Sequence, residues 1–134
     1  MSQPTDVQDD RRYTKDHEWA LKKDGDVVVG ISAFAVDQLG DITLVNWNVA
    51  AGDKVAVGDV FGTIESVKTL SDLFAPVAGT VVRLNPELES APERVNEDCW
   101  DKGWLVVLRP EDPSATDALL APSAYREHIA SLEH

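Results

Sequence analysis

The feature that most constrains this 134-residue chain is a succession of short β-type runs with glycine or proline between them. No long helical pattern alternates with these runs, which argues against parallel βαβ units. The pattern therefore predicts a mainly β fold, an antiparallel barrel or sandwich with short peripheral and C-terminal helices. The predicted strands lie within 17–22, 26–31, 41–47, 53–57, 59–65, 68–74, 79–84 and 103–109.

Local turn and cap signals refine this prediction. Asp24-Gly25 joins the first two runs and is a strong hairpin signal. Ser32 can cap a short helix that Gly40 ends. The polar stretch 85–103 is expected to be a loop with at most one helical turn.

The two ends of the chain differ in character. Residues 1–12 are polar and aperiodic, which predicts a disordered tail before a domain that spans 13–110. In the segment 111–134, Ser114 and Asp117 resemble a capping box, and a second short helix is expected after Pro122. We therefore expect a C-terminal helical segment over 111–134.

The charge distribution restricts the possible partners. The formal net charge is −12, of which about −7 falls in 13–110 and −4 in 111–134. Such a surface repels nucleic acids and anionic membranes, and it suits partners with basic docking faces. No apolar run approaches the length of a membrane span, and the first residues lack the features of a secretory signal or transit peptide. These observations predict a cytoplasmic protein.

The usual catalytic and metal-binding patterns are missing. Cys99 is the only cysteine, so no intrachain disulfide can form, and no histidine lies near it in the sequence. The three histidines, His17, His128 and His134, do not have metal-ligand spacing. The sequence also lacks phosphate-binding glycine loops, and its acidic pairs are expected to be solvated. The chain therefore does not look like an enzyme.

One lysine stands out instead. Lys68 is the only basic residue between Lys54 and Arg83, and it lies near the join of two predicted strands. Strand periodicity places it at or beside a hairpin tip, with a flexible stem and an amine in solvent. It is then either an ordinary surface lysine or the attachment point for a mobile group, and physical reasoning alone leaves both interpretations open.

The residues around Lys68 resemble a known modification site. "ESVK" at 65–68, "SD" at 71–72 and "APVAG" at 75–79 resemble the lipoylation site of the H-protein family of the glycine cleavage system. "YTKDHEW" at 13–19, "QLGD" at 38–41, "VNED" at 95–98 and "GW" at 103–104 follow in the family's order and spacing. The chain departs from the family pattern at "SAFA" (32–35), "NWN" (46–48) and "DCW" (98–100).

The resemblance implies a fold and a modification. The fold is the lipoyl/biotinyl type, a flattened antiparallel barrel-sandwich hybrid with quasi-twofold symmetry and the modified lysine at a hairpin turn. Lipoate is then covalently bound as an amide on Lys68. Glu65 and Gly79 correspond to family residues that are implicated in recognition during lipoylation.

The resemblance also implies a cleft that receives the loaded arm. Glu18 of "HEW" and Asp72 of "KTLSD" correspond to residues at the cargo amine. Ile31 and Leu39 correspond to residues beside the arm. These four positions are expected to lie together.

The implied function is that of a carrier, not a catalyst. In the family, the arm takes the aminomethyl group of glycine from the pyridoxal-phosphate glycine decarboxylase to the tetrahydrofolate-dependent aminomethyltransferase. Dihydrolipoamide dehydrogenase, a flavin enzyme, then reoxidises the arm. A lipoate ligase or a lipoyl/octanoyl transferase is the implied modifying enzyme. No nucleic acid or membrane partner is expected.

Three other interpretations of the lysine turn compete with this one. Biotin carriers flank their lysine with methionines, whereas Lys68 has Val67 and Thr69 as neighbours. Lipoyl domains of 2-oxoacid dehydrogenases usually carry Asp-Lys-Ala at the turn and belong to longer multidomain chains. A lipoate-relay protein that feeds other lipoylated enzymes, or an unmodified interaction module, stays open because the same lysine arm would serve a relay.

Overall fold

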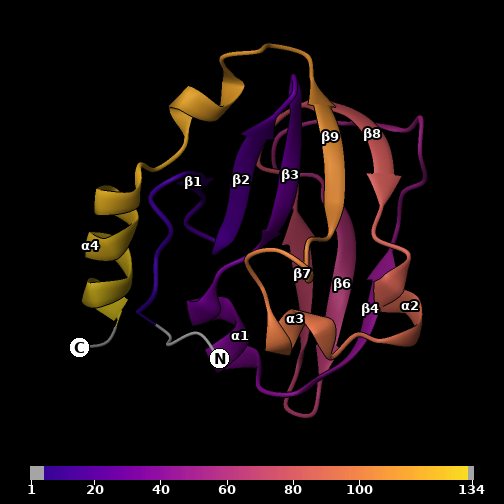
Figure 1. The fold of residues 1–134 in the computed structure, drawn as a ribbon, viewed down its shortest axis with the longest axis vertical. Helices are drawn as coiled ribbons and strands as arrows, with labels where there is room; N and C mark the ends of the chain where they lie inside the picture. Colours follow the sequence, from indigo (N-terminus) through magenta and orange to yellow (C-terminus); the bar gives the residue numbers. More distant parts are fainter. Residues whose placement is uncertain (1–4, 133–134) are drawn as a thin grey trace.

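The computed structural model describes residues 5–132 as two antiparallel sheets around one core (Figure 1). The larger sheet has the strand order β1-β2-β3-β9-β8-β5 and the smaller sheet the order β4-β6-β7. This confirms the predicted mainly β class, and the arrangement fits a barrel-sandwich. The strands are β1 Arg12–Tyr13, β2 Glu18–Lys23, β3 Asp26–Ile31, β4 Ile42–Trp47, β5 Lys54–Val55, β6 Val60–Ser66, β7 Leu70–Phe74, β8 Gly79–Leu84 and β9 Val106–Pro110.

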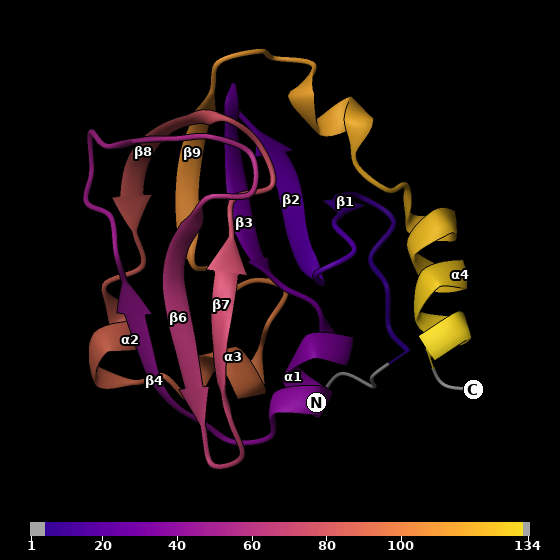
Figure 2. The same cartoon turned by 180° about the vertical axis from the view of Figure 1, so that it is seen from behind.

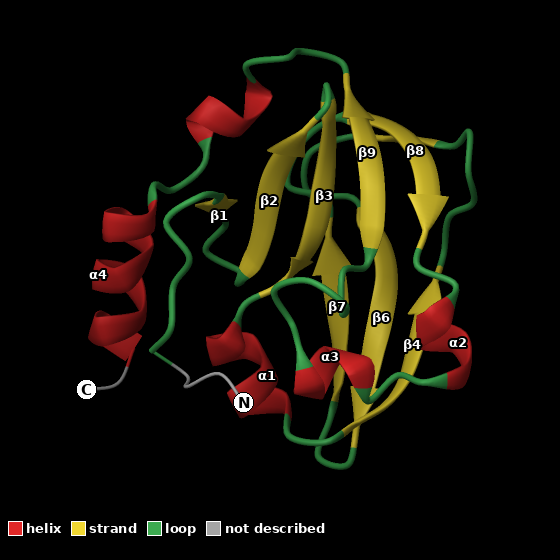
Figure 3. Ribbon diagram, in the orientation of Figure 1, coloured by secondary structure: helices red, strands yellow, loops and turns green. Residues whose placement is uncertain are grey.

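Short helices lie at the ends of the sheets and beside them, as Figure 3 shows by colour. The α-helices are α1 Ala33–Leu39, α2 Glu87–Ser90, α3 Arg94–Glu97 and α4 Pro122–Leu132, and a 3-10 helix spans Ala115–Ala118. The view from behind in Figure 2 shows the smaller sheet in front of the larger one, with α4 outside both.

The core forms where the inward faces of the two sheets meet. Val29 and Leu108 of the larger sheet join Phe61 and Ile64 of the smaller one in a single buried cluster. All four side chains are fully buried. Removal of this apolar surface from water is the main force that holds the two sheets together.

The predicted hairpin and the predicted helix are both confirmed. Asp24 and Gly25 connect β2 to β3 with φ of 54° and 85°, the left-handed conformation that a two-residue hairpin turn requires. The Ser32 hydroxyl accepts a hydrogen bond from the N–H of Ala35 at the start of α1. Gly40 ends α1 with φ of 79°, and its N–H donates to Val36.

The stretch 85–103 contains more helix than expected. It forms two short helices, α2 and α3, where the sequence predicts at most one turn. Each helix is anchored by one fully buried side chain, Leu88 or Val95. A single apolar residue per turn gives no helical periodicity, so the sequence pattern could not reveal these two elements.

The N-terminal segment is also more ordered than expected. Residues 1–4 lie outside the described part of the chain, but Arg11 is only 9% exposed and does not belong to a free tail. Its guanidinium lies 4.5 Å from the ring centre of Trp19 and donates to the carbonyl of Trp100 at 2.9 Å. A sequence pattern scores Arg11 as polar, whereas cation–π contacts and its long stem allow it to be buried.

The C-terminal segment packs firmly against the β domain. Tyr125 of α4 stacks on Tyr13 with a centroid distance of 4.3 Å, and Ile129 joins the same second cluster. The capping box predicted at Ser114 is wrong, because this residue makes no side-chain cap. Its own N–H and hydroxyl instead donate to Asp112. Among residues 5–132, no helix is both long and apolar enough to cross a membrane.

Candidate functional site: the lysine turn and the adjoining cleft

Lys68 lies in the three-residue connection between β6 and β7, as the sequence predicts, and its side chain is exposed. Ser66 organises this turn. Its N–H donates to the carbonyl of Thr69 at 2.8 Å, and its Oγ accepts from the N–H groups of Lys68 and Thr69, both at 3.2 Å. Ser66 is part of "ESVK", but no sequence pattern indicates its role in the turn.

The loop after α1 also holds the turn in place. The N–H of Val67 donates to the carbonyl of Asp41 at 3.0 Å. Asn96 of α3 holds the same loop on both sides, since its amide donates to Gly40 and accepts from the N–H of Ile42, each at 2.9 Å. The residues "QLGD" and "VNED", which are far apart in sequence, therefore fix the position of the lysine turn together.

Gly40 also leaves room for the lysine stem. A Cβ atom at this position would lie 3.3 Å from Cε of Lys68 and 3.6 Å from Cδ. The stem of Lys68 therefore runs across Gly40, beside the end of α1. Leu39, the neighbour of Gly40, lines a cleft that begins here.

This cleft has a volume of about 460 Å³ and borders the free edge of β7. In Figures 1 and 2, that edge faces α1 and the β2–β3 hairpin. The structure brings together here the four residues predicted for the loaded arm: Glu18, Ile31, Leu39 and Asp72. Five polar residues that the sequence did not indicate also line the cleft: Lys15, Asp16, His17, Gln38 and Ser71.

Glu18 is the most unusual group of the cleft. It is only 2% exposed, yet it carries a carboxyl group. The hydroxyl of Thr14 donates to Oε1 at 2.7 Å, and the N–H of Phe74 approaches Oε2 at 3.5 Å. Burial raises the pKa of Glu18 to about 7, and these two hydrogen bonds only partly oppose that effect. A cationic ligand beside Glu18 would lower this pKa and so favour the ionised carboxylate near neutral pH.

The chain around His17 aims Glu18 into the cleft. His17 has a φ of 74°, a strained conformation for a non-glycine residue, and its carbonyl accepts from Ser32. Its Nδ1 lies 2.8 Å from the hydroxyl of Tyr125, which in turn lies 2.6 Å from the hydroxyl of Ser32. Burial, followed by the neighbouring His128, lowers the pKa of His17. Helix α4 therefore holds one wall of the cleft in place.

Glu65 and Gly79 occupy different environments. Glu65 is exposed on β6, opposite Leu70 and three residues before Lys68. Gly79 is buried at the start of β8, and a Cβ atom there would overlap the carbonyl of Arg109 on β9. Figure 1 shows that β8 starts at the end of the sheet opposite the β6–β7 turn. The structure therefore does not bring Gly79 together with Glu65 and Lys68.

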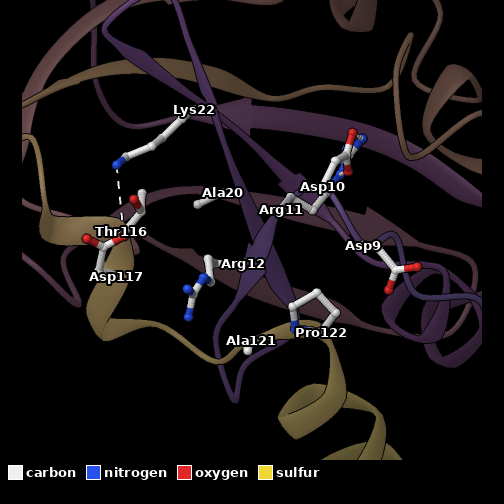
Figure 4. A pocket seen from close by; sticks show the side chains of 10 residues that line it. All are labelled: Asp9, Asp10, Arg11, Arg12, Ala20, Lys22, Thr116, Asp117, Ala121 and Pro122. Atoms are coloured by element: carbon white, nitrogen blue, oxygen red, sulfur yellow. Dashed lines mark hydrogen bonds and ion pairs between the residues drawn. The ribbon is translucent and has the colours of Figure 1, made fainter.

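A second groove of about 270 Å³ lies between β1, β2 and the C-terminal segment (Figure 4). Lys22 and Asp117 face each other across it at 3.9 Å, and Asp9 and Arg12 also line it. Its charged side chains are of both signs, and none comes from β6 or β7. This groove is thus separate from the lysine turn and its cleft.

The cysteine and the possible metal ligands of residues 5–132 offer no second reactive site. Cys99 is 3% exposed, and burial raises the pKa of its thiol to about 12, so it is a poor nucleophile. Within residues 5–132, no group of histidine, cysteine and acidic side chains could hold a metal ion. An exposed lysine on a fixed hairpin, beside a cleft with a buried carboxyl group, is therefore the main chemical feature of the described chain.

A barrel-sandwich with a projecting lysine at a hairpin turn defines the class of single-lysine carrier domains, and comparisons with known proteins specify the family. The family model "Glycine cleavage H-protein" matches residues 11–132. Glycine cleavage system H proteins of Magnetococcus marinus and Chlorobium limicola are 52% and 50% identical to the chain over 113 and 125 residues. These matches cover 84% and 92% of this chain, and 80% and 97% of the relatives.

A solved structure agrees with this result. The crystal structure of a glycine cleavage system H protein from Mycobacterium marinum is 35% identical, with a TM-score of 0.82. The match covers 96% of this chain and all of that one. The chain belongs to the glycine cleavage H-protein family.

The environment of Glu18 predicts a specific pH dependence of stability. Its carboxyl group stays protonated in the folded protein up to about pH 7, but the unfolded chain ionises it near pH 4.5. The stabilisation of the protonated form is therefore present at low pH and is lost as the pH rises through about 7. The wild type should therefore lose about 2–3 kcal/mol of unfolding free energy, relative to Glu18→Gln, when the pH is raised from 5 to 8. Urea denaturation at both pH values measures this difference, and parallel profiles would contradict the assigned environment.

Proposed function

We propose that the protein is a non-catalytic carrier of the glycine cleavage system, with a lipoyl group attached to Lys68. The observation that carries the proposal is the position of this lysine, exposed on a fixed hairpin beside the cleft that contains Glu18. Membership of the H-protein family supports the same assignment. A second role as a lipoate relay has no separate observation in its favour.

The residues present fit a lipoyl group. The Lys68 amine is accessible for amide formation, and the hydrogen bonds of Ser66 and Val67 hold the turn that presents it. Gly40 gives the stem a path toward the cleft. When attached, the lipoyl group supplies a dithiolane whose sulfurs carry the aminomethyl group of glycine and then reducing equivalents.

The cleft residues would hold and shield the cargo. The carboxyl groups of Glu18 and Asp72 suit a cationic amine, and Ile31 and Leu39 give an apolar wall that excludes water. A cation beside Glu18 favours its ionised form, which opposes the effect of burial on its pKa. Glu18 would therefore release its proton when the cargo docks, and the resulting ion pair would be shielded from solvent.

The proposed partners follow from the family. They are glycine decarboxylase, the aminomethyltransferase, dihydrolipoamide dehydrogenase, and a lipoate ligase or lipoyl/octanoyl transferase. The acidic surface of the chain, with a net charge of −12, suits basic docking faces on these enzymes. A tethered arm raises the effective concentration of the cargo at each docked site, which is the advantage of a carrier. We place this activity in the cytoplasm.

Lys68→Arg tests the attachment site. Arginine keeps the positive charge and most of the length but cannot form the lipoyl amide. The variant should fold with wild-type stability, take up no lipoyl group from a lipoate ligase, and fail to support glycine decarboxylation. Lys54→Arg, at another exposed lysine, is the matched control and should be lipoylated normally. Intact mass measures the uptake, and lipoylation of the Lys68→Arg variant would refute the assignment.

Glu65→Ala and Gly79→Ala separate recognition from folding. Glu65 is exposed near the lysine, so its loss should slow lipoylation about tenfold while the unfolding free energy changes by less than about 0.5 kcal/mol. Gly79→Ala should cost about 1–3 kcal/mol in stability, because β9 leaves no room for a Cβ atom. Initial rates with a lipoate ligase and urea denaturation provide the two measurements.

Glu89→Ala, at an exposed acid on α2, is the control for a general loss of negative charge. Equal lipoylation rates for Glu65→Ala and the wild type would reject the recognition role of Glu65. Wild-type stability of Gly79→Ala would reject the packing role of Gly79.

A further inference from the structure

Thr14 closes the loop that leads into β2. Its N–H donates to the carbonyl of Glu18 at 2.9 Å, and its carbonyl accepts from the N–H of His17 at 3.1 Å. Its hydroxyl oxygen accepts from the N–H groups of Asp16 and Glu18, both at 3.2 Å. These backbone contacts fix the position of the Thr14 hydroxyl beside the start of β2.

The hydroxyl of Thr14 can act on the Glu18 side chain only as a donor. A threonine hydroxyl has one hydrogen and two lone pairs. The N–H groups of Asp16 and Glu18 use the lone pairs, so the single hydrogen goes to Oε1 of Glu18 at 2.7 Å. A fixed donor favours the carboxylate over the protonated carboxyl group. This contact therefore lowers the pKa of Glu18, although burial raises it by more.

Thr14 approaches Glu18 from a second hollow, and not from the cleft. This hollow has a volume of about 300 Å³, and Glu18 and Phe74 line both it and the cleft. Thr14 lines only the second hollow, together with Tyr13 and Leu120. Thr14 can therefore influence a ligand in the cleft only through the carboxyl group of Glu18.

The other groups around Glu18 do not duplicate this contact. The N–H of Phe74 approaches Oε2 at 3.5 Å, which is long for a hydrogen bond. The like charge of Asp16 acts in the opposite sense and raises the pKa of Glu18. Within residues 5–132, Thr14 is the only side chain that donates a hydrogen bond to Glu18. The titratable side chains that line the cleft with Glu18 or interact with it are Lys15, Asp16, His17, Asp72 and Tyr125.

We propose that Thr14 is a positioning residue, whose hydroxyl fixes the Glu18 carboxyl group and sets the lowest pH at which the protein retains its cargo. As the pH falls, Glu18 takes up a proton and loses its attraction for a cationic amine. The hydrogen bond from Thr14 moves this protonation to a lower pH. Its effect on the cargo rests on the proposed function, since it requires the lipoyl arm on Lys68. Its effect on Glu18 is a property of the unmodified chain.

Carbon-13 NMR of the Glu18 carboxyl group tests the hydroxyl in the unmodified, full-length protein. Thr14→Val keeps the size of the side chain but removes the hydroxyl, so the pKa of Glu18 should rise by about one pH unit. Thr14→Ser keeps the hydroxyl and should restore the wild-type pKa. Thr80→Val, on β8 and outside both hollows, is the matched control and should leave this pKa unchanged.

The direction of the shift separates this role from a role in folding alone. Thr14→Val also removes the acceptor for the N–H groups of Asp16 and Glu18. A loosened loop would expose Glu18 to water and lower its pKa toward the ordinary value of 4.5. A rise therefore supports the proposal, whereas a fall or an unchanged pKa overturns it.

The wild type offers a measurement that does not depend on a variant. The hydroxyl proton of Thr14 should be protected from exchange with solvent, because it is held by Oε1 of Glu18. Its NMR resonance should move with pH at the midpoint of the Glu18 titration. A hydroxyl proton that exchanges freely at all pH values would contradict the proposal.

Release of label from the loaded protein extends the test to the cargo. Each variant is lipoylated, loaded with labelled glycine by glycine decarboxylase, and followed without the aminomethyltransferase. As the pH is lowered, release should accelerate about one pH unit earlier in Thr14→Val than in the wild type. Thr14→Ser and Thr80→Val should follow the wild-type profile. Intact mass confirms lipoylation in each sample.

The outcomes are distinct. If mass shows no lipoylation of the wild type, the proposed function fails, and the effect of Thr14 on the cargo is refuted with it. If the proteins are lipoylated but Glu18 titrates equally in Thr14→Val and the wild type, Thr14 is not a positioning residue, while the carrier function stands. A higher pKa of Glu18 without a shift in the release profile would also overturn the role of Thr14 in retention of the cargo.

Discussion

The site depends on a carboxyl group buried between the two sheets. Glu18 begins β2 of the larger sheet, and its Oε2 faces the N–H of Phe74 on β7 of the smaller sheet. Burial of an unpaired charge is so unfavourable that the carboxyl group holds its proton to about pH 7. The strained backbone of His17, which Tyr125 and Ser32 hold in place, fixes this arrangement. A cation beside this carboxyl group would favour its ionised form.

Much of the fold and the position of Lys68 could be predicted from local signals. Asp24-Gly25 specifies a turn by its backbone conformation, and Ser32 and Gly40 mark the ends of α1. Asn96 could not be found in this way, because its two hydrogen bonds reach backbone atoms 54 and 56 residues away. A polar side chain that serves distant backbone atoms leaves no periodic pattern in the sequence.

The family motif combines residues with different physical roles. Trp19 of "HEW" fills the space over Gly30, where a Cβ atom would overlap its ring, and its indole N–H donates to Ile31 and Cys99. Gly79 likewise allows a close approach between β8 and β9. Such positions are needed for the fold, whereas Glu65 is exposed beside the turn. Sequence resemblance places all these residues in one motif. The packing shows which of them the fold requires and which lie on the surface.

In the proposed function, the cleft protects the cargo, and the arm alone does not. The most direct measurement follows the release of label from lipoylated protein loaded with labelled glycine, in the absence of the aminomethyltransferase. Glu18→Gln and Asp72→Asn should be lipoylated normally but lose label faster than the wild type, several-fold for each contact worth about 1 kcal/mol. Release at the wild-type rate in both variants would contradict it.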